Sequence, residues 1–307
     1  MRKFRFLQYD VFTNTPFGGN QLAVFPDASS LSDAEMQAIA REMNFSETTF
    51  VLPADDLKAL RRVRIFTPSS ELPFAGHPVV GTTFALASEG IIPPVEPSPV
   101  HLQLGVGTLP VDLLFEGERL SFVWMHQPVP NFTPWRGDVA RLAAALGLAA
   151  GDLDSRLPIE RGSAGLAYLY IPVRTQAALR AAMPTDALTS LLADPSGHLH
   201  AYLFTRDALA TGVDARARMF ARDLGIMEDA ATGSAAGPLG VYLLRHGVAA
   251  PDELGETRMR FEQGIEMGRT SALYVAVSGA AGAVHDVRVG GEAVLVARGE
   301  LLLPDHA

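Results

Sequence analysis

The chain has 307 residues, enough for two domains with hydrophobic cores, and its 48% hydrophobic and 19% charged content excludes a disordered protein. A formal net charge of −9 provides no electrostatic basis for binding nucleic acid or anionic lipid. The absence of cysteine excludes disulfides, thiolate metal sites and a thiol nucleophile or base.

Strands outnumber helices in the predicted order of elements. The N-terminal residues lack the apolar core and cleavage site of a signal peptide, which favours the cytoplasm. Residues 4–12 alternate in polarity and predict a strand, and Ser32 with Glu35 forms a capping box that predicts a helix to about Met43. Further strands are expected at 22–25, 48–52, 63–66, 100–104, 108–115, 120–124, 167–172, 201–205, 258–262, 271–278 and 293–300. Helices are expected at 76–90, 139–146 and 233–247. Because strands mostly neighbour strands, the predicted class is α+β, and no apolar run is long enough to span a membrane.

Two segments of the chain repeat each other in outline. One runs from Gly76 to Gly90 and the other from Gly233 to Gly247, and a Glu stands five residues before each opening Gly. A repeat this long indicates two like domains rather than a solenoid. We place them at 1–126 and 127–307, with room for the last strand to pack back on the first half. Like domains commonly share one small-molecule site.

Each repeat predicts a helix that is apolar on all sides and therefore surrounded by protein. Gly90 and Gly247 are natural C-terminal stops because glycine takes the left-handed conformation at little cost. The free N–H groups at the helix starts, Gly76-His77 and Gly233-Ser234, carry partial positive charge and can hold a carboxylate or an enolate. Taken singly, each glycine is better explained by close helix–sheet packing, but the matched pair favours a site.

Glu47 is the carboxylate that breaks the repeat. Aligning Pro53 with Pro172 places Leu166 opposite Glu47, so Glu47 has no symmetry partner. A carboxylate beside an apolar strand is expected to be partly desolvated, which raises its pKa toward values useful for proton transfer. The alternative is a surface Glu in a helix-to-strand turn.

Four motifs in the right order resemble the PhzF-like phenazine-biosynthesis protein family. They are Ser46–Phe50, Phe66–Pro68, Glu71–Pro78 and Glu228–Ala235, and residues 19–24 resemble the family's N-terminal signature. The family resembles diaminopimelate epimerase in fold, which implies two pseudo-symmetric halves, each a curved, mostly antiparallel sheet wrapped around a central helix. The chain departs from the family at Gln21 and Ala230, where Pro is common, and these departures bear on the substrate more than on the reaction type.

The resemblance implies roles for particular residues. Glu47 becomes the acid/base, with His77 and Asp229 as further catalytic positions, and Gly76 and Ser234 match substrate-contacting positions. Gly233 joins them through its place at the second helix start. The family lacks the epimerase's two catalytic cysteines, as this chain does, and His77 and Ser234 stand at the corresponding helix starts. The resemblance also suggests a homodimer.

The predicted reaction is a cofactor-free proton shift on a small carboxylic acid. Glu47 removes a proton from carbon, the two helix N-termini and Ser234 hold the developing negative charge, and Glu47 or Asp229 returns the proton to another carbon. For His77 the alternative role is a structural bond to backbone, and for Asp229 it is capping of the second helix. No metal is expected, because the His198-x-His200 pair has no third ligand in view.

Two other functions remain open. One is a racemase or dehydratase of the same fold acting on an amino or imino acid, against which the missing cysteines count. The other is a non-enzymatic protein that binds a small ligand, against which the intact Glu47 and Asp229 count, because a binding protein has no need of a base.

Overall fold

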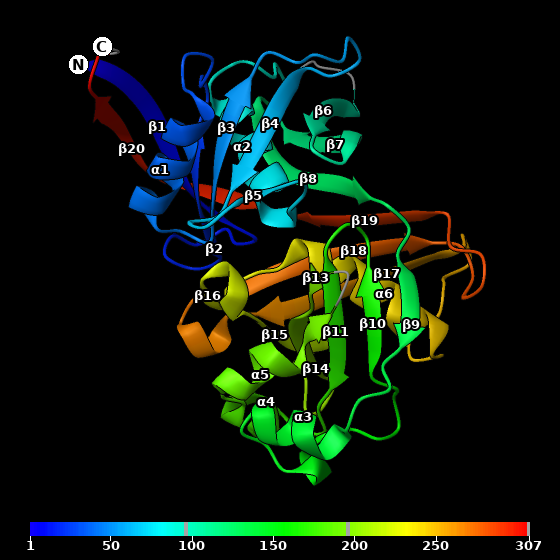
Figure 1. Cartoon of the computed structure of the whole chain (residues 1–307). Coiled ribbons are helices and arrows are strands. Elements are labelled where there is room, and N and C mark those ends of the chain that lie inside the picture. The colour runs from blue at the N-terminus through cyan, green and yellow to red at the C-terminus, as the bar shows by residue number, and fades with distance from the viewer. Residues whose placement is uncertain (95–97, 195–196, 306–307) are drawn as a thin grey trace. The chain divides into compact units, whose positions relative to one another are not determined.

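The structure, a computed structural model, describes residues 1–94, 98–194 and 197–305 (Figure 1). The chain divides into two compact units, Met1–His126 with Val289–Ala307, and Gln127–Arg288. The chain ends meet in the first unit, where the N-terminal ammonium of Met1 lies 2.7 Å from the Asp305 carboxylate. The last strand runs beside the first, as the dark blue and dark red arrows of Figure 1 show.

The first unit is a sheet with one central and one outer helix. Its elements are β1 (Arg2–Val11), β2 (Asn20–Phe25), α1 (Asp33–Met43), β3 (Glu47–Leu52), β4 (Arg61–Phe66), β5 (Glu71–Leu72), α2 (Gly76–Ser88), β6 (Val100–Leu104), β7 (Gly107–Glu116), β8 (Arg119–Gln127) and β20 (Ala293–Leu303). The strands pair in the order β20–β1–β2–β3–β4–β6–β7–β8, and β5 adds to β4. Only β2 with β3 and β4 with β6 are parallel.

Helix α2 is the centre of this unit. Every residue from Gly76 to Leu86 is buried, as expected for a helix that is apolar all round. It packs on β1, β2, β3 and β20. A Cβ at Gly81 would lie 2.6 Å from side-chain carbons of both Val11 and Leu22, so glycine allows the helix to approach the sheet closely. The helix ends at Ser88, and Gly90 follows with a left-handed φ of 71°.

The outer face of the same sheet is covered by α1. Its capping box is present as predicted, with Ser32 and Glu35 bonded to each other's backbone N–H. Met36 and Ile39 pack in one buried cluster with Phe25 and Phe50, whose rings stack with centroids 5.1 Å apart. The two faces of the sheet are therefore closed by one helix each.

The second unit is built in the same way. Its elements are β9 (Asn131–Pro134), α3 (Val139–Ala145), η1 (Ala150–Asp152), β10 (Glu160–Ser163), β11 (Ala167–Pro172), α4 (Gln176–Ala181), α5 (Asp186–Leu191), β12 (Ala193–Asp194), β13 (Gly197–His198), β14 (His200–Thr205), β15 (Ala215–Ala221), η2 (Arg222–Leu224), β16 (Ile226–Asp229), α6 (Gly233–Arg245), β17 (Glu256–Gln263), η3 (Ile265–Met267), β18 (Ser271–Ser278) and β19 (Asp286–Gly291), in which the unit boundary falls. The strands pair in the order β9–β10–β11–β14–β15–β17–β18, and β16 adds to β15.

The pairing pattern of the second unit repeats that of the first. Only β11 with β14 and β15 with β17 are parallel, which matches β2 with β3 and β4 with β6. The strand that precedes each central helix, β5 or β16, pairs antiparallel with the fifth strand of its sheet, β4 or β15. The predicted α+β class, with mostly antiparallel sheets wrapped around central helices, is confirmed.

Helix α6 is the counterpart of α2. It is buried from Gly233 to Leu244 and packs on β10, β17 and β18. It ends at Arg245, and Gly247 follows with a φ of 68°. Pro238 lies inside the helix without delaying its start, so the later start that this proline could cause does not occur.

One alignment made from the sequence is wrong. Matching Pro53 with Pro172 aligns β3 with β11. This alignment treats the helix at 139–145 as the counterpart of α1. In the structure α3 precedes β10, and two six-residue helices, α4 and α5, stand where α1 stands in the first unit, between β11 and β14. The counterpart of β3 is therefore β14.

Candidate active site

Glu47 and His77 lie together in the first unit. Glu47 is the first residue of β3 and His77 is the second residue of α2, and both are buried. His77 Nε2 lies 3.4 Å from Glu47 Oε2. The other ring nitrogen, Nδ1, lies 3.1 Å from the amide nitrogen of Asn20, at the start of β2. Asn20 was not predicted as a site residue, although it belongs to the N-terminal signature.

Burial determines the charge of His77. Desolvation lowers the pKa of His77 to about 3, against a smaller upward effect of a hydrogen bond with the Gln21 backbone. The imidazole is therefore neutral near pH 7 and carries one proton on its two ring nitrogens. The Asn20 amide and the Gln21 backbone both bond to the imidazole, so these two partners together decide which ring nitrogen carries the proton.

No side chain caps the start of α2. Its N-cap is Ala75, which has no side chain able to accept from the first N–H groups. Gly76 is the first helical residue, directly before His77. An uncapped helix start retains its partial positive charge, which is the property an anion site needs.

Asp229 ends β16 in the second unit and is held by a buried chain of hydrogen bonds. Thr232 donates through Oγ1 to Asp229 Oδ2 at 2.6 Å. Gln263 donates through Nε2 to Thr232 Oγ1 at 2.9 Å and to the Asp229 carbonyl at 2.8 Å. Its Oε1 accepts from the Thr232 N–H and from the Tyr202 hydroxyl, each at 3.2 Å. One amide at the end of β17 therefore fixes the loop that leads into α6.

Ser234 is the second residue of α6, the position that His77 has in α2. Its hydroxyl lies 2.7 Å from that of Tyr168 on β11. Gly233 precedes it, and the Gly233 carbonyl accepts from the Gln127 side chain at 2.9 Å. The N-cap Thr232 makes no side-chain cap, so the start of α6 resembles that of α2.

A residue missed from the sequence stands opposite Glu47 in the repeat. Glu47 pairs with Leu22 across the parallel strands β2 and β3, and His200 pairs with Tyr168 across the parallel strands β11 and β14. His200 is the first residue of β14, as Glu47 is of β3. The positional counterpart of Glu47 is therefore His200 and not Leu166.

His200 has surroundings unlike those of Glu47. It is buried, with Nδ1 at 3.3 Å from Asp223 Oδ1 and the Tyr168 ring centroid at 5.8 Å. Tyr168, whose hydroxyl meets Ser234, thus links the strand that carries His200 to the start of α6. The sequence signal is the aligned pair Phe66 and Phe220, which face Thr48 and Ala201, the residues directly after Glu47 and His200.

The predicted site residues therefore form two groups, one in each unit. Glu47, Gly76 and His77 come together in the first unit. Asp229, Gly233 and Ser234 come together in the second. Among residues 1–94, 98–194 and 197–305, no group of three His, Asp or Glu residues is placed to hold a metal ion. The side chain of His198, half of the His-x-His pair, lies outside the described part of the chain. No helix in that part is long and apolar enough to cross a membrane.

These features define a class of protein: an α+β chain of two like units, each with a sheet around an apolar helix whose uncapped start carries a polar residue. A protein described as a probable proline racemase from Agrobacterium radiobacter has this fold, with a TM-score of 0.67 at 15% identity over 98% of this chain and 93% of that chain. The chain belongs to the PhzC–PhzF family of phenazine biosynthesis-like proteins, whose model matches residues 9–299. The resemblance stated from the motifs is confirmed.

Relatives match over almost the whole chain. Trans-2,3-dihydro-3-hydroxyanthranilate isomerase of Pseudomonas chlororaphis is 39% identical over 96% of this chain and 98% of its own length. The structure of a Bacillus anthracis PhzF-family protein has a TM-score of 0.85 at 30% identity and covers 99% of this chain and 100% of its own. A predicted epimerase from Pseudomonas aeruginosa has a TM-score of 0.79 at 36% identity, over 98% and 100%.

Proposed function

We propose that this chain is a cofactor-independent isomerase that transfers a proton between carbon atoms of a small carboxylic acid. The substrate class we propose is trans-2,3-dihydro-3-hydroxyanthranilate and close analogues. The support is the name of the 39% identical relative, which matches nearly end to end. The single structural observation that carries the reaction type is the buried Glu47 carboxylate 3.4 Å from a neutral imidazole.

Glu47 is the proposed acid/base. A carboxylate that removes a proton from carbon has to be aimed by its surroundings and shielded from water, and Glu47 is 6% exposed at the start of a buried strand. Neutral His77 contacts it without the charge of an imidazolium, which would stabilise the ionised carboxylate and weaken it as a base. His77 therefore flanks the Glu47 carboxylate as a neutral group, and the Asn20 amide and the Gln21 backbone hold the imidazole in place.

The helix starts are the proposed binding positions for negative charge. Gly76 in α2 and Gly233 with Ser234 in α6 present backbone N–H groups at uncapped helix ends. Such groups act on charge that develops during proton removal, because they are already aligned before the reaction. The Ser234 hydroxyl can donate to a ligand while it accepts from Tyr168.

Asp229 is the proposed second proton-transfer group. It lies at the end of β16, and its carboxylate accepts from Thr232 while its carbonyl accepts from Gln263. These bonds fix the position of Asp229. The variant Asp229→Asn tests its role as proton donor. Full turnover in that variant would restrict Asp229 to a structural role at the start of α6.

The decisive experiment is deuterium incorporation from D2O, followed by NMR, during turnover of trans-2,3-dihydro-3-hydroxyanthranilate. Glu47→Gln is compared with wild type and with Glu42→Gln, the same change at an exposed residue of α1. The proposal expects deuterium at one carbon of the product with wild type and Glu42→Gln, and loss of turnover by about 10²- to 10⁴-fold in Glu47→Gln. Full activity in Glu47→Gln contradicts it. Isomerisation without solvent deuterium would instead show that Glu47 returns the removed proton to the other carbon without exchange.

Two further parts of the proposal concern assembly and location. We propose a homodimer, supported by the family resemblance, and a cytoplasmic enzyme. Light scattering on the purified chain tests the first, and a monomer mass contradicts it. Fractionation of cells that express the chain tests the second.

A further inference from the structure

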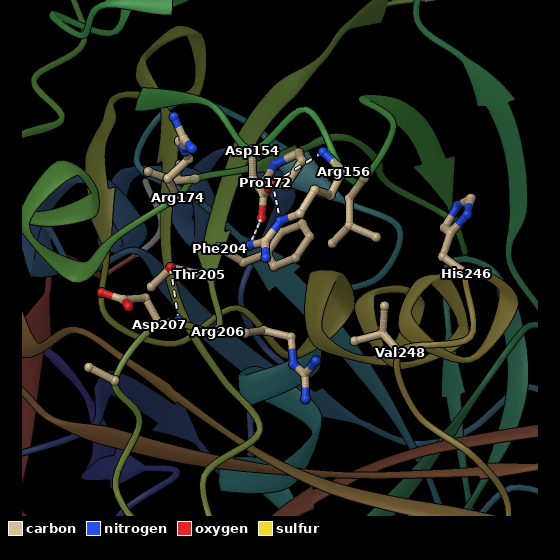
Figure 2. Close-up of a pocket in the computed structure, with 13 residues that line it drawn as sticks. Asp154, Arg156, Pro172, Arg174, Phe204, Thr205, Arg206, Asp207, His246 and Val248 are labelled. Carbon is tan, nitrogen blue, oxygen red and sulfur yellow. Dashed lines mark hydrogen bonds and ion pairs between the residues drawn. The ribbon is translucent and has the colours of Figure 1, made fainter. Parts of the chain in front are cut away.

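A cavity of the second unit is lined by none of the proposed catalytic or substrate-binding residues. It has a volume of about 550 Å³ and is lined from the ends of β11 and β14, from the turn at 154–157 and from residues beyond the end of α6 (Figure 2). Ser234 lies at the start of α6, whereas His246 and Val248 follow its end. At about 1.5 Å per residue these two ends are about 18 Å apart.

The position of the cavity is one that favours ligands. β11 and β14 are adjacent parallel strands, with Pro172 opposite Phe204 at their carboxyl ends. Ligands of mixed and parallel sheets commonly bind beyond the carboxyl ends of such strands. The volume falls in the range of pockets that hold small molecules.

The surface of the cavity is more polar than apolar, with a smaller apolar part at one side. Pro172, Val173 and Phe204 lie buried behind the lining, whereas Leu157 and Val248 are half-buried at its side. The carbonyls of Leu243 and Leu244 at the end of α6 are already bonded, because they accept from Val248 and Gly247. Leu157 and Val248 therefore supply the apolar contact for a small hydrocarbon or aromatic body.

Three arginines stand around the opening, each from a separate loop, as Figure 2 shows. Arg156 is neutralised, because its guanidinium bonds both oxygens of Asp154 at 2.8 and 2.7 Å. Arg174 and Arg206 form no ion pair with any carboxylate in the described part of the chain. They donate to the carbonyls of Gly151, at 3.3 Å, and Asp214, at 3.1 Å.

The remaining carboxylate of the lining is held in place by another element. Asp207 accepts through Oδ2 from the Gln176 N–H at 3.2 Å, and Gln176 Nε2 donates to the Asp207 carbonyl at 2.8 Å. The loop after β14 is therefore ordered before any ligand binds, which lowers the entropy cost of binding. Three arginines against Asp154 and Asp207 leave one net positive charge.

We propose that this cavity is a second binding site, separate from the catalytic residues, for a small organic monoanion with one carboxylate on a compact apolar body. Arg174 and Arg206 bind the carboxylate, and Leu157 with Val248 contacts the body. One surplus positive charge matches a single negative charge, and the apolar side formed by Leu157 and Val248 distinguishes an organic acid from an inorganic ion. This inference is independent of the isomerase proposal.

The test is a titration of the full chain, labelled with ¹³C at Leu and Val methyl groups, with sodium benzoate, benzamide and inorganic phosphate as probes. Methyl signals of Val173 and Val248 report on this cavity, and those of Val79, next to His77, report separately on the first unit. We expect saturable shifts at Val173 and Val248 with benzoate and none with neutral benzamide or with phosphate. Arg174→Gln and Arg206→Gln each weaken benzoate binding by about tenfold or more, because each removes a charge-assisted hydrogen bond.

The matched control is Arg180→Gln, the same change at an exposed arginine outside the lining. It retains wild-type benzoate affinity. Methyl spectra of the variants without ligand establish that each is folded. The proposal is overturned if benzoate causes no saturable shift at Val173 and Val248, if benzamide or phosphate shifts them as benzoate does, or if both lining variants bind benzoate like wild type.

Discussion

Glu47 and His200 occupy the same position in the two halves of the chain. Glu47 is the first residue of β3, which pairs in parallel with β2, and it lies opposite Leu22. His200 is the first residue of β14, which pairs in parallel with β11, and it lies opposite Tyr168. The duplicated fold thus places an ionisable residue at this point twice. The two differ in what lies beside them: an imidazole 3.4 Å from Glu47, and the Asp223 carboxylate 3.3 Å from His200.

This difference predicts unequal effects of mutation on turnover. His200 contacts Tyr168, which bonds to Ser234, so His200→Gln is expected to act through the placement of Ser234. KM rises by several-fold and kcat falls by less than about tenfold, whereas Glu47→Gln lowers kcat by about 10²- to 10⁴-fold. Steady-state kinetics on trans-2,3-dihydro-3-hydroxyanthranilate measures both.

Tyr168→Phe is the companion variant. It removes the hydroxyl that meets Ser234 but leaves the ring beside His200, so it should reproduce the rise in KM. If His200→Gln instead lowers kcat as much as Glu47→Gln does, His200 is a proton-transfer group and the positioning account fails.

A second prediction concerns Gln263. Gln263→Leu leaves the Thr232 N–H and the Tyr202 hydroxyl without the acceptor they share, in a fully buried place. We expect a loss of about 1–3 kcal/mol in the free energy of unfolding, together with a lower kcat, because the loop carrying Asp229 loses its support. Denaturant titration and steady-state kinetics measure the two effects.

Tyr202→Phe separates the contributions within this network. It removes one hydrogen bond to Gln263 and leaves the three bonds to Asp229 and Thr232, so its cost should be about 1 kcal/mol with kcat near wild type. Equal losses of kcat in Tyr202→Phe and Gln263→Leu would show that support of the Asp229 loop is not what Gln263 provides.

The repeat in the sequence predicted the parts of the fold that depend on local signals. Each central helix begins at the expected glycine, Gly76 or Gly233. The change from an extended segment to a long apolar run marks this start in the sequence. Both ends lie two residues before the expected Gly90 and Gly247. Each glycine is the left-handed residue after the helix rather than its last helical residue.

The partners of the site residues were beyond the reach of the sequence. Asn20 and Gln263 lie 57 and 34 positions from the residues they hold, His77 and Asp229, and only strand pairing brings them there. The two helices of the second half that the sequence did not predict, α4 and α5, are six residues each, too short for a clear periodic pattern. Missing them shifted the alignment and concealed His200.

A third prediction concerns the contact of α2 with its sheet. In Gly81→Ala the new Cβ would lie 2.6 Å from carbons of Val11 and Leu22, below any normal contact distance. We expect a loss of about 1–3 kcal/mol in the free energy of unfolding, because a packed core does not absorb an added methyl without displacement. Gly151→Ala, where the added Cβ meets open space, should change it by less than about 0.5 kcal/mol. Equal stabilities of these two variants would contradict the close approach.

The last prediction follows from the buried His77. Its pKa is lowered to about 3 in the folded chain, whereas an unfolded histidine titrates near pH 6.5. Between these values the unfolded state binds more protons, so the stabilisation is complete above about pH 6.5 and is lost as the pH falls toward 3. At pH 5 the loss from this one residue is about 2 kcal/mol relative to pH 7.5.

His77→Gln removes this titration and retains a side chain that can bond to Asn20. The free energy of unfolding of wild type should therefore fall by about 2 kcal/mol more than that of His77→Gln between pH 7.5 and pH 5. Denaturant titrations of both proteins at the two pH values give this difference directly. A difference near zero would mean that His77 is protonated in the folded state at pH 5. It would then be an imidazolium beside Glu47, and the neutral-imidazole account of the site would be wrong.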